Sequence, residues 1–383
     1  MTEKEIQTVK HEHLPDILRG FAVFLMVFGH CIQEGSGLTF RQESLYFEDK
    51  LYQFIYSFHM PLFMLLSGYL AWGSLERAET VPDRIRLLKR RSAGLLLPIA
   101  IWTLLEKIYA FVFNRIMGYP NPSFMTQMSD YLKSFLTNFW FLWAVFWCFL
   151  IVYIMHYYLH DSIPLYVLGF LALFFLPDGM GLGAYKYMLP YYIAAFYFHG
   201  MLLQNTFACA PGDSASSGQA AGQNGSRLCQ LFTLLYRHPL SLLLVSGGLF
   251  LFLFSFYTES SFIYLSGYKL IGKDITTQLF IDLHRTLIGF AGCVFFILLW
   301  KSIMQKLPDY RFPVMTLLGR NSLGIYLTSG YLTLFGIMRF SDPLPPSYLR
   351  NFAETLAVLA GSVLLTGLFG RLPILRVLVG RLR

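Results

Sequence analysis

Ten apolar stretches recur along this chain, and most of them are close to the roughly 20 residues that a helix needs to cross a bilayer. Hydrophobic residues make up 55% of the 383 residues and charged residues only 14%, whereas soluble domains carry about 25% charged residues. The chain is therefore predicted to be an all-α integral membrane protein, a bundle of about ten transmembrane helices. The predicted spans are 17–36, 51–73, 93–114, 138–158, 163–177, 187–205, 239–257, 278–300, 314–338 and 352–370.

The distribution of Lys and Arg predicts that both chain ends are cytoplasmic, because short cytoplasmic loops carry an excess of these residues. With a cytoplasmic N-terminus, the inside segments hold 19 of the 30 Lys and Arg residues, and the outside loops hold nine. The formal charge of +8 follows from this clustering at the ends of the spans, and it indicates no nucleic-acid partner.

The chain is predicted to be a single membrane domain over residues 1–383. Residues 211–226 are rich in Gly, Ser and Ala and cannot bury a core, so residues 206–237 are predicted to form a flexible cytoplasmic linker between the sixth and seventh spans. The five cysteines form no C-x-x-C or Cys/His spacing, and neither a metal site nor a disulfide framework is indicated.

The first span carries three polar residues that an apolar helix should reject: Asp16, Arg19 and His30. An Arg or Asp at the centre of a membrane helix costs about 2.5 to 3.5 kcal/mol. At about 100° per residue, Arg19 and His30 return to within about 20° of each other and lie roughly 16 Å apart along the axis. Polar groups placed on one face in this way usually line a bundle interior or a water-filled cavity, which predicts a functional site.

Each of these residues has a chemical reading and a structural one. His30 is predicted as a general base that takes a proton from a hydroxyl, directly or by way of an acyl-enzyme, or else as a histidine hydrogen-bonded between helices. Arg19 either clamps a phosphate or pyrophosphate with its planar fork, or snorkels to the cytoplasmic edge. Asp16 orients Arg19 or caps the helix.

The basic run at 84–94 is first of all a topology signal, and within it Arg90 and Arg91 could attract a polyanionic cofactor at the cytoplasmic mouth. Glu106, in the third span, lies about as far from the entry of its helix as His30 lies from its own. It is a candidate partner that orients the His30 base, as a carboxylate does in a catalytic triad. The alternative is a Glu–Lys pair with Lys107 at a looser interface.

The second span contains Pro61, which predicts a kink and a freed carbonyl near His59. His59, Ser67 and Tyr69 are predicted to line the same cavity and bind substrate. The alternative is ordinary kinked packing, with Gly68 at a close helix contact.

Polar and aromatic residues also mark the predicted outer side. Asp282, His284 and Arg285 open the eighth span and could bind an outward polar acceptor such as a sugar, or form an interfacial ion pair. Trp140 opens the fourth span, where it suits an aromatic belt or a platform against a sugar ring.

These residues together resemble the membrane acyltransferase 3 family. The D-x-x-R-G run followed by a histidine, with ten residues between Arg19 and His30, resembles one signature of that family, and FHMPLFMLLSGYL at 58–70 resembles another. The wording of the second is closest to the fucose 4-O-acetylase-like branch. Three weaker matches follow in the expected order: the basic run ending at Pro98, the W-F-L at 140–142, and LGRNSLGIYL at 318–327.

The resemblance implies a bacterial cytoplasmic-membrane enzyme of about ten helices. Such proteins move an acyl group, usually acetyl, from cytosolic acyl-CoA to a hydroxyl of an extracytoplasmic or lipid-linked carbohydrate, here an exopolysaccharide, capsule or lipid-linked glycan. The arginine and histidine regarded as essential in the family fall on Arg19 and His30. Two positions depart from its pattern: Ser329 stands where a histidine is common, and Gly94 where a second basic residue is expected.

The predicted function is therefore an O-acyltransferase in the lipid bilayer, with acetyl-CoA as donor and a carbohydrate as acceptor. One alternative is a multi-helix transporter or glycolipid flippase, in which Arg19, His30 and Glu106 line the path. Another is a membrane scaffold in a polysaccharide export complex, for which the same charges would be dispensable.

Overall fold

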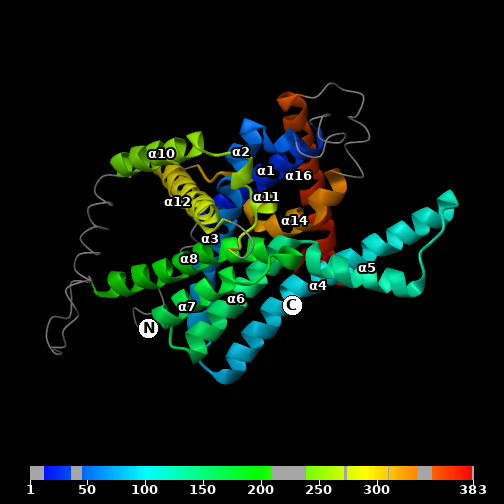
Figure 1. Cartoon of the computed structure of the whole chain (residues 1–383), viewed down its shortest axis with the longest axis horizontal. Helices are drawn as coiled ribbons and strands as arrows, with labels where there is room; N and C mark the ends of the chain where they lie inside the picture. Colours follow the sequence, from blue (N-terminus) through cyan, green and yellow to red (C-terminus); the bar gives the residue numbers. More distant parts are fainter. Residues whose placement is uncertain are drawn as a thin grey trace.

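The computed structural model describes residues 13–35, 45–208, 239–270, 274–308, 310–333 and 347–381, and the regular elements within these ranges are all helices (Figure 1). The predicted all-α class is thus confirmed for the described part of the chain. The α-helices are α1 (His13–Gly35), α2 (Lys50–Tyr56), α3 (His59–Glu76), α4 (Val81–Met117), α5 (Phe124–Thr137), α6 (Trp140–Tyr158), α7 (Ile163–Phe174), α8 (Leu182–Ala208), α10 (Pro239–Ser255), α11 (Ile263–Ser266), α12 (Ile275–Lys306), α13 (Pro313–Arg320), α14 (Ser322–Tyr331) and α16 (Tyr348–Arg371). The 3-10 helices are η2 (Leu45–Phe47), η3 (Gly179–Gly181), η4 (Glu259–Ser261) and η6 (Leu375–Val379).

Six helical segments are long and apolar enough to cross a membrane: His13–Gln33, Lys50–Glu76, Val81–Met117, Trp140–Tyr158, Ile275–Lys306 and Tyr348–Arg371. Helix α7 and the apolar part of α10 are shorter than a span. A helix occupies each of the ten predicted ranges at least in part, so the chain has the make-up of an all-α membrane protein. The predicted linker 206–237 lies outside the described residues except for the last turn of α8.

The second predicted span is two helices, because α2 ends at Tyr56 and α3 begins at His59. Pro61 lacks a backbone N–H, and its ring clashes with the carbonyl four residues earlier, which is that of Ser57. The helix therefore ends before the proline, and Pro61 takes a place in the first turn of α3, where proline is tolerated. The predicted kink at Pro61 is in the structure a break about one turn earlier.

The ninth predicted span is also divided, since α13 ends at Arg320 and α14 begins at Ser322. Asn321 lies at the break, where its side-chain Nδ2 donates to the carbonyl of Leu317 at 2.8 Å. Such a side-chain bond competes with the backbone bonds that would continue the helix. The end of this predicted span, 334–338, lies outside the described residues.

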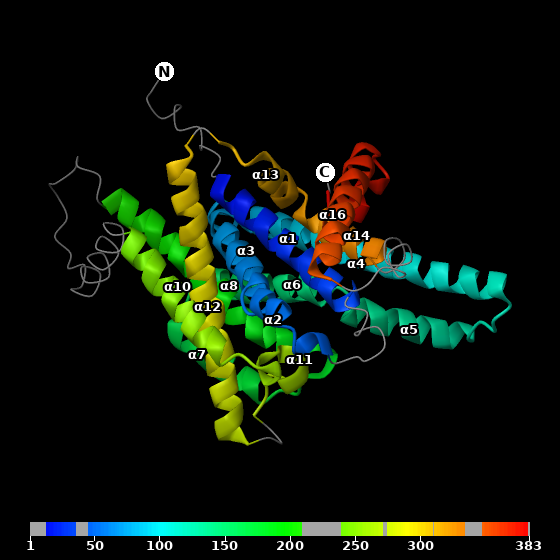
Figure 2. The same cartoon turned by 90° about the horizontal axis from the view of Figure 1, so that it is seen from above.

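Helix α1 lies inside the bundle, in contact with α3, α13, α14 and α16 (Figure 2). Its backbone approaches that of α13 so closely that only glycine fits at two positions of the crossing. A Cβ on Gly20 would overlap the carbonyl oxygen of Met315, and a Cβ on Gly319 would overlap that of Asp16. Small residues at a helix interface let backbones approach in this way in membranes. The polar start of α1 is thereby pressed against the end of α13.

A second close crossing joins α3 to α8, where a Cβ on Gly68 would overlap the carbonyl oxygen of Tyr192. This is the close helix contact that the sequence allowed for Gly68. Around it lies the largest apolar cluster of the described residues, built from α3, α6 and α8. These two glycine crossings fix α1 and α3, the helices that carry most of the predicted site.

Helices α4 and α5 form an arm that projects from the bundle (Figure 1). The second half of α4 exposes large apolar side chains along its length, and α5 buries none of its residues. The arm therefore gains little from packing on the bundle, and apolar surface of this extent indicates contact with lipid.

We expect Gly20→Ala to destabilise the protein by about 1–3 kcal/mol, because the added methyl overlaps backbone that cannot rotate away. The melting temperature in detergent should fall by a few degrees. The matched control is Gly248→Ala in α10, where a Cβ meets no atom within 4 Å and alanine favours the helix. An unchanged melting temperature for Gly20→Ala would contradict the close α1–α13 crossing.

Candidate active site

One buried carboxylate holds two arginines at the start of α1. Asp16 Oδ1 lies 3.4 Å from Arg19 Nη1, and Asp16 Oδ2 lies 3.2 Å from Arg320 Nε. The Asp16 side chain is 8% exposed, whereas that of Arg320 is 55% exposed. The group carries more positive than negative charge, and part of that charge faces solvent. The contact with Arg19 fits one of the two roles that the sequence left open for Asp16, that of orienting Arg19.

Arg91 of α4 joins this group. Its side chain lies within electrostatic reach of Arg19, its Nη2 donates to Ser74 Oγ at 3.2 Å, and its guanidinium carbon lies 5.5 Å from the centre of the Phe149 ring. Arg90, the neighbouring residue, is exposed. The structure thus brings Arg19 and Arg91 together and leaves Arg90 on the outside of α4.

Two histidines meet at the other end of α1. His30 has the side chain of Gln33 as a hydrogen-bond partner, and it lies within electrostatic reach of His59. His59 is buried, with Nδ1 2.8 Å from the carbonyl of Ile55. A ring nitrogen that faces a carbonyl carries the proton, so Nε2 of His59 is the acceptor. The ring of Tyr56 packs edge-on against His59, with centroids 4.6 Å apart.

Glu106 takes part in a different group. Asn138 Nδ2 donates to Glu106 Oε2 at 3.0 Å, and Lys107 Nζ lies 3.4 Å from Oε1. Both contacts belong to the base of the α4–α5 arm, and among the described residues neither involves His30. This geometry favours the Glu–Lys pair that the sequence offered as the alternative, because equal depth along two helices does not place two side chains face to face.

The other candidates on α3 have partners of their own. Ser67 Oγ donates to the carbonyl of Phe63 at 2.8 Å. The ring of Tyr69 stacks on that of His199, with centroids 3.9 Å apart, and His199 Nδ1 lies 2.5 Å from the Tyr69 carbonyl. Of the three residues predicted to line one cavity, His59 lies within electrostatic reach of His30.

Asp282 and Arg285 form a buried pair at the start of α12, with Arg285 Nη2 2.9 Å from Asp282 Oδ1. Gln278 Nε2 also donates to Asp282 Oδ1, at 3.0 Å. The rings of Tyr187 and Tyr268 lie 6.0 and 5.8 Å from the guanidinium carbon. Arg285 is 1% exposed, and its Nε and Nη1 have no partner within the described part of the chain. The pair therefore keeps unused donors inside the protein.

The remaining outer candidates lie apart from this pair. His284 Nε2 lies 2.9 Å from the carbonyl of Leu253, so this side chain contacts α10 instead of Asp282 and Arg285. Trp140 packs edge-on against Tyr264 of α11, with centroids 5.9 Å apart. Helix α11 also carries Ser266, whose hydroxyl accepts a hydrogen bond from Arg285 Nη2, and so it connects Trp140 with the buried pair.

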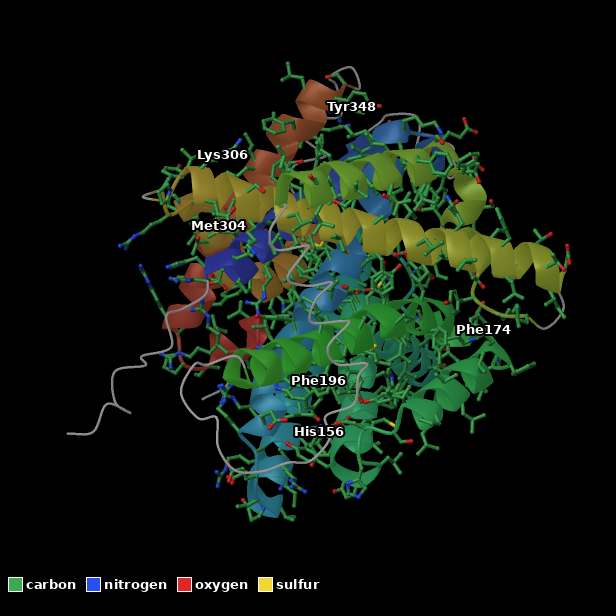
Figure 3. The ribbon with its side chains drawn as sticks, turned by 90° about the vertical axis from the view of Figure 1, so that its left-hand side faces the viewer. His156, Phe174, Phe196, Met304, Lys306 and Tyr348 are labelled. Carbon is green, nitrogen blue, oxygen red and sulfur yellow. The ribbon has the colours of Figure 1, made fainter. Side chains whose placement is uncertain are left out.

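Two polar groups, one buried and one half-buried, were missed from the sequence. Lys186 is 1% exposed and lies 3.0 Å from Asp178 Oδ1 and 3.2 Å from the carbonyl of Tyr268; an isolated lysine before an apolar run was its only signal. His156 Nδ1 lies 2.7 Å from Asp161 Oδ2, and its ring packs near Phe196 with centroids 5.8 Å apart (Figure 3). No spacing in the sequence marks this second group, because its contacts depend on the turn after α6.

The described residues meet the requirements neither of a disulfide nor of a metal site. Cys31, Cys148 and Cys293 are buried and are not disulfide-bonded. Among the residues that the structure describes, no three His, Cys, Asp or Glu side chains gather in a way that could hold a metal ion.

We expect loss of one partner of the Asp282–Arg285 pair to destabilise the protein by about 3–5 kcal/mol, because the other charge is then buried alone. Arg285→Met should melt well below the wild type. The double variant Asp282→Leu with Arg285→Met should recover most of the loss, since it removes both charges. A double variant that loses as much as the two single variants combined would show that the charges do not interact.

Comparison with known proteins gives a family match over residues 13–371, to a model described as an acyltransferase domain. Two nodulation proteins named NolL are also similar. The one from Mesorhizobium japonicum is 28% identical over 184 residues, which are 48% of this chain and 46% of that protein. The one from Sinorhizobium fredii is 31% identical over 137 residues, 36% of this chain and 34% of that protein.

The chain thus spans less than half the length of the curated relatives that it matches. No solved structure matches it. The family match, in contrast, covers nearly the whole chain and includes both signatures on which the resemblance rested, from Arg19 to His30 and from Phe58 to Leu70. The resemblance is confirmed, and the chain belongs to the acyltransferase 3 family.

Proposed function

We propose that this protein is a membrane O-acyltransferase, which moves an acetyl group from cytosolic acetyl-CoA to a hydroxyl of a cell-surface or lipid-linked carbohydrate. The observation that carries the proposal is the arrangement along α1: a cationic group at one end and a pair of histidines about 16 Å further along the axis. Family membership supports acyl transfer as the reaction. The identity of the donor, the identity of the acceptor and the roles of the residues are part of our proposal.

The cationic group is suited to the phosphates of the donor. Planar guanidinium groups bind phosphate oxygens through two parallel hydrogen bonds, and Arg19 and Arg91 lie within electrostatic reach of each other. Two like charges within electrostatic reach of each other favour a dianionic ligand between them. We assign the pyrophosphate of CoA to these two side chains, with the pantetheine arm extending along α1 toward His30.

His30 is proposed as the general base. It takes the proton of the acceptor hydroxyl while the hydroxyl oxygen bonds to the thioester carbonyl carbon. The carbon–sulfur bond then breaks, and the thiolate of CoA takes up the proton from His30. His59 keeps its proton on Nδ1, directed at the Ile55 carbonyl, and offers Nε2 as an acceptor for a neighbouring hydroxyl of the acceptor sugar.

The acceptor site is proposed on the opposite side of the protein, around Arg285. Its unpartnered Nε and Nη1 donors suit sugar oxygens, and the nearby rings of Tyr187 and Tyr268 offer apolar faces. The charge of Arg285 is already balanced by Asp282 at 2.9 Å. A neutral sugar therefore fits this site better than an acidic one.

The reaction needs a protein that is reached by the donor from the cytoplasm and by the acceptor from the outside, and the topology predicted from the sequence provides this. We propose ten spans in a bacterial cytoplasmic membrane, one membrane domain over residues 1–383, both ends in the cytoplasm and the 206–237 linker on the same side. Acyl-CoA then reaches Arg19 from the cytoplasm, and the acceptor reaches Arg285 from the outside. Arg90, Ser67, Tyr69 and Glu106 have contacts or exposure that favour packing or topology over the chemistry, so we assign them no step.

The test is acetyl-CoA turnover by the purified protein in nanodiscs. We expect His30→Gln to lower kcat about 10²- to 10⁴-fold, the usual contribution of a general base. Arg19→Gln should instead raise KM for acetyl-CoA at least tenfold, because it removes charge-assisted hydrogen bonds worth about 1.5–3 kcal/mol each. Labelled acetyl, supplied with extracts of surface glycans, reports transfer.

Two exposed residues provide matched controls for this test. His160→Asn, in the turn after α6, and Arg86→Gln, on the exposed face of α4, change the same residue types away from the site. Both should retain wild-type kinetics. Full transfer by a well-folded His30→Gln protein would exclude the proposed base, and a wild type that binds no acetyl-CoA but moves glycolipid across vesicles would favour the flippase.

A further inference from the structure

The last described segment of the chain folds back onto α4, α14 and α16. Element η6 follows α16 and packs on α4, where Trp102 Nε1 donates to the carbonyl of Leu378 at 2.8 Å. Gly380 has a φ of 68° and packs against the carbonyl of Gly94, with a Cβ there 3.1 Å from it. A left-handed residue without a side chain lets the chain turn here, which directs Arg381 toward α13 and α14.

Arg381 contacts the break between α13 and α14, directly after Arg320. Its Nη2 donates to Asn321 Oδ1 at 3.0 Å, and Asn321 directly follows Arg320. The other end of the Asn321 amide donates to the Leu317 carbonyl, which fixes the orientation of the amide. Arg320 in turn contacts Asp16 through Nε alone, so its two terminal nitrogens remain available in the described structure.

These side chains extend the cationic group to the surface. The ion pairs described for Arg19, Arg91, Arg320 and Arg381 involve a single carboxylate, that of Asp16. Arg19 is 31% exposed, against 55% for Arg320, and Arg381 is exposed as well. We call Arg19 and Arg91 the inner pair, and the more exposed Arg320 and Arg381 at the α13–α14 break the outer pair.

We propose that the outer pair is a second phosphate subsite, which binds the 3′-phosphate monoester on the ribose of CoA. The inference rests on the proposed donor and follows from the order of groups along it. The thioester is followed by the pantetheine arm, the pyrophosphate and the ribose with its 3′-phosphate. If the thioester reaches His30 and the pyrophosphate the inner pair, the 3′-phosphate lies further out, at the level of Arg320 and Arg381. A phosphate monoester carries nearly two charges at pH 7, and two guanidinium groups match it.

The experiment compares the binding of CoA and 3′-dephospho-CoA by calorimetry. The full chain is placed in nanodiscs of phosphatidylcholine, so that no anionic headgroup competes for the outer pair. We expect the wild type to bind CoA about 10- to 100-fold more tightly than 3′-dephospho-CoA, as one or two charge-assisted hydrogen bonds would give. Arg381→Gln and Arg320→Gln should each lower this ratio toward one, by weakening the binding of CoA and leaving that of 3′-dephospho-CoA nearly unchanged.

Further variants guard against indirect effects. Arg381→Lys keeps the charge and should retain part of the preference even if the bond to Asn321 is lost. Arg86→Gln removes a cation from the exposed face of α4 and should leave the ratio unchanged. A wild type that binds both ligands equally would overturn the second subsite while the proposed donor stands. A wild type that binds neither would instead remove the donor itself.

Discussion

The backbone contact between α1 and α13 determines where the charges of this protein lie. Two glycines, Gly20 and Gly319, remove the side chains that would keep the helices apart, and Asp16 then reaches the guanidinium at the end of α13 as well as the one on its own helix. Because α1 is a continuous helix of 23 residues, the same contact also fixes the height of His30. Arg19 and His30 are therefore parts of one rigid element.

The charged groups around Arg320 and those around Arg285 differ in charge balance and in exposure. On the side of Arg320 positive charge is in excess and partly exposed, which attracts polyanions. On the side of Arg285 the charges are paired and buried: Asp282 with Arg285, and Asp178 with Lys186. Desolvation makes such pairs costly unless each charge keeps its partner and further hydrogen bonds, and the carbonyls around Lys186 supply these. The chemistry of the two sides thus suits the charged donor and the neutral acceptor that we propose.

Much of this was readable from the sequence, because it depended on period and composition. The helical class followed from the apolar stretches, and the grouping of Arg19 with His30 on one helix followed from a spacing of eleven residues. Glu106 shows the limit of such reasoning: depth along α4 could be estimated, but the tilt that turns it toward Asn138 could not. Lys186 falls between two predicted spans although it is buried, since its partners come from two segments, the turn after α7 and the stretch after α11. The break at Ser57 depends on Pro61, and the break at Asn321 on a hydrogen bond of its own side chain. Neither position can be located from the pattern of apolar residues.

The length of α4 has a consequence for the membrane around the protein. Its 37 residues extend about 55 Å as a helix, while the hydrocarbon core of a bilayer is about 30 Å thick. A helix this long either tilts strongly or leaves the hydrocarbon before it ends, and its angle depends on the thickness of the surrounding lipid. Glu106 and Trp102 attach the base of the arm to Asn138 and Leu378. A change in bilayer thickness that alters the tilt of α4 would therefore also move the chain segment that carries Arg381.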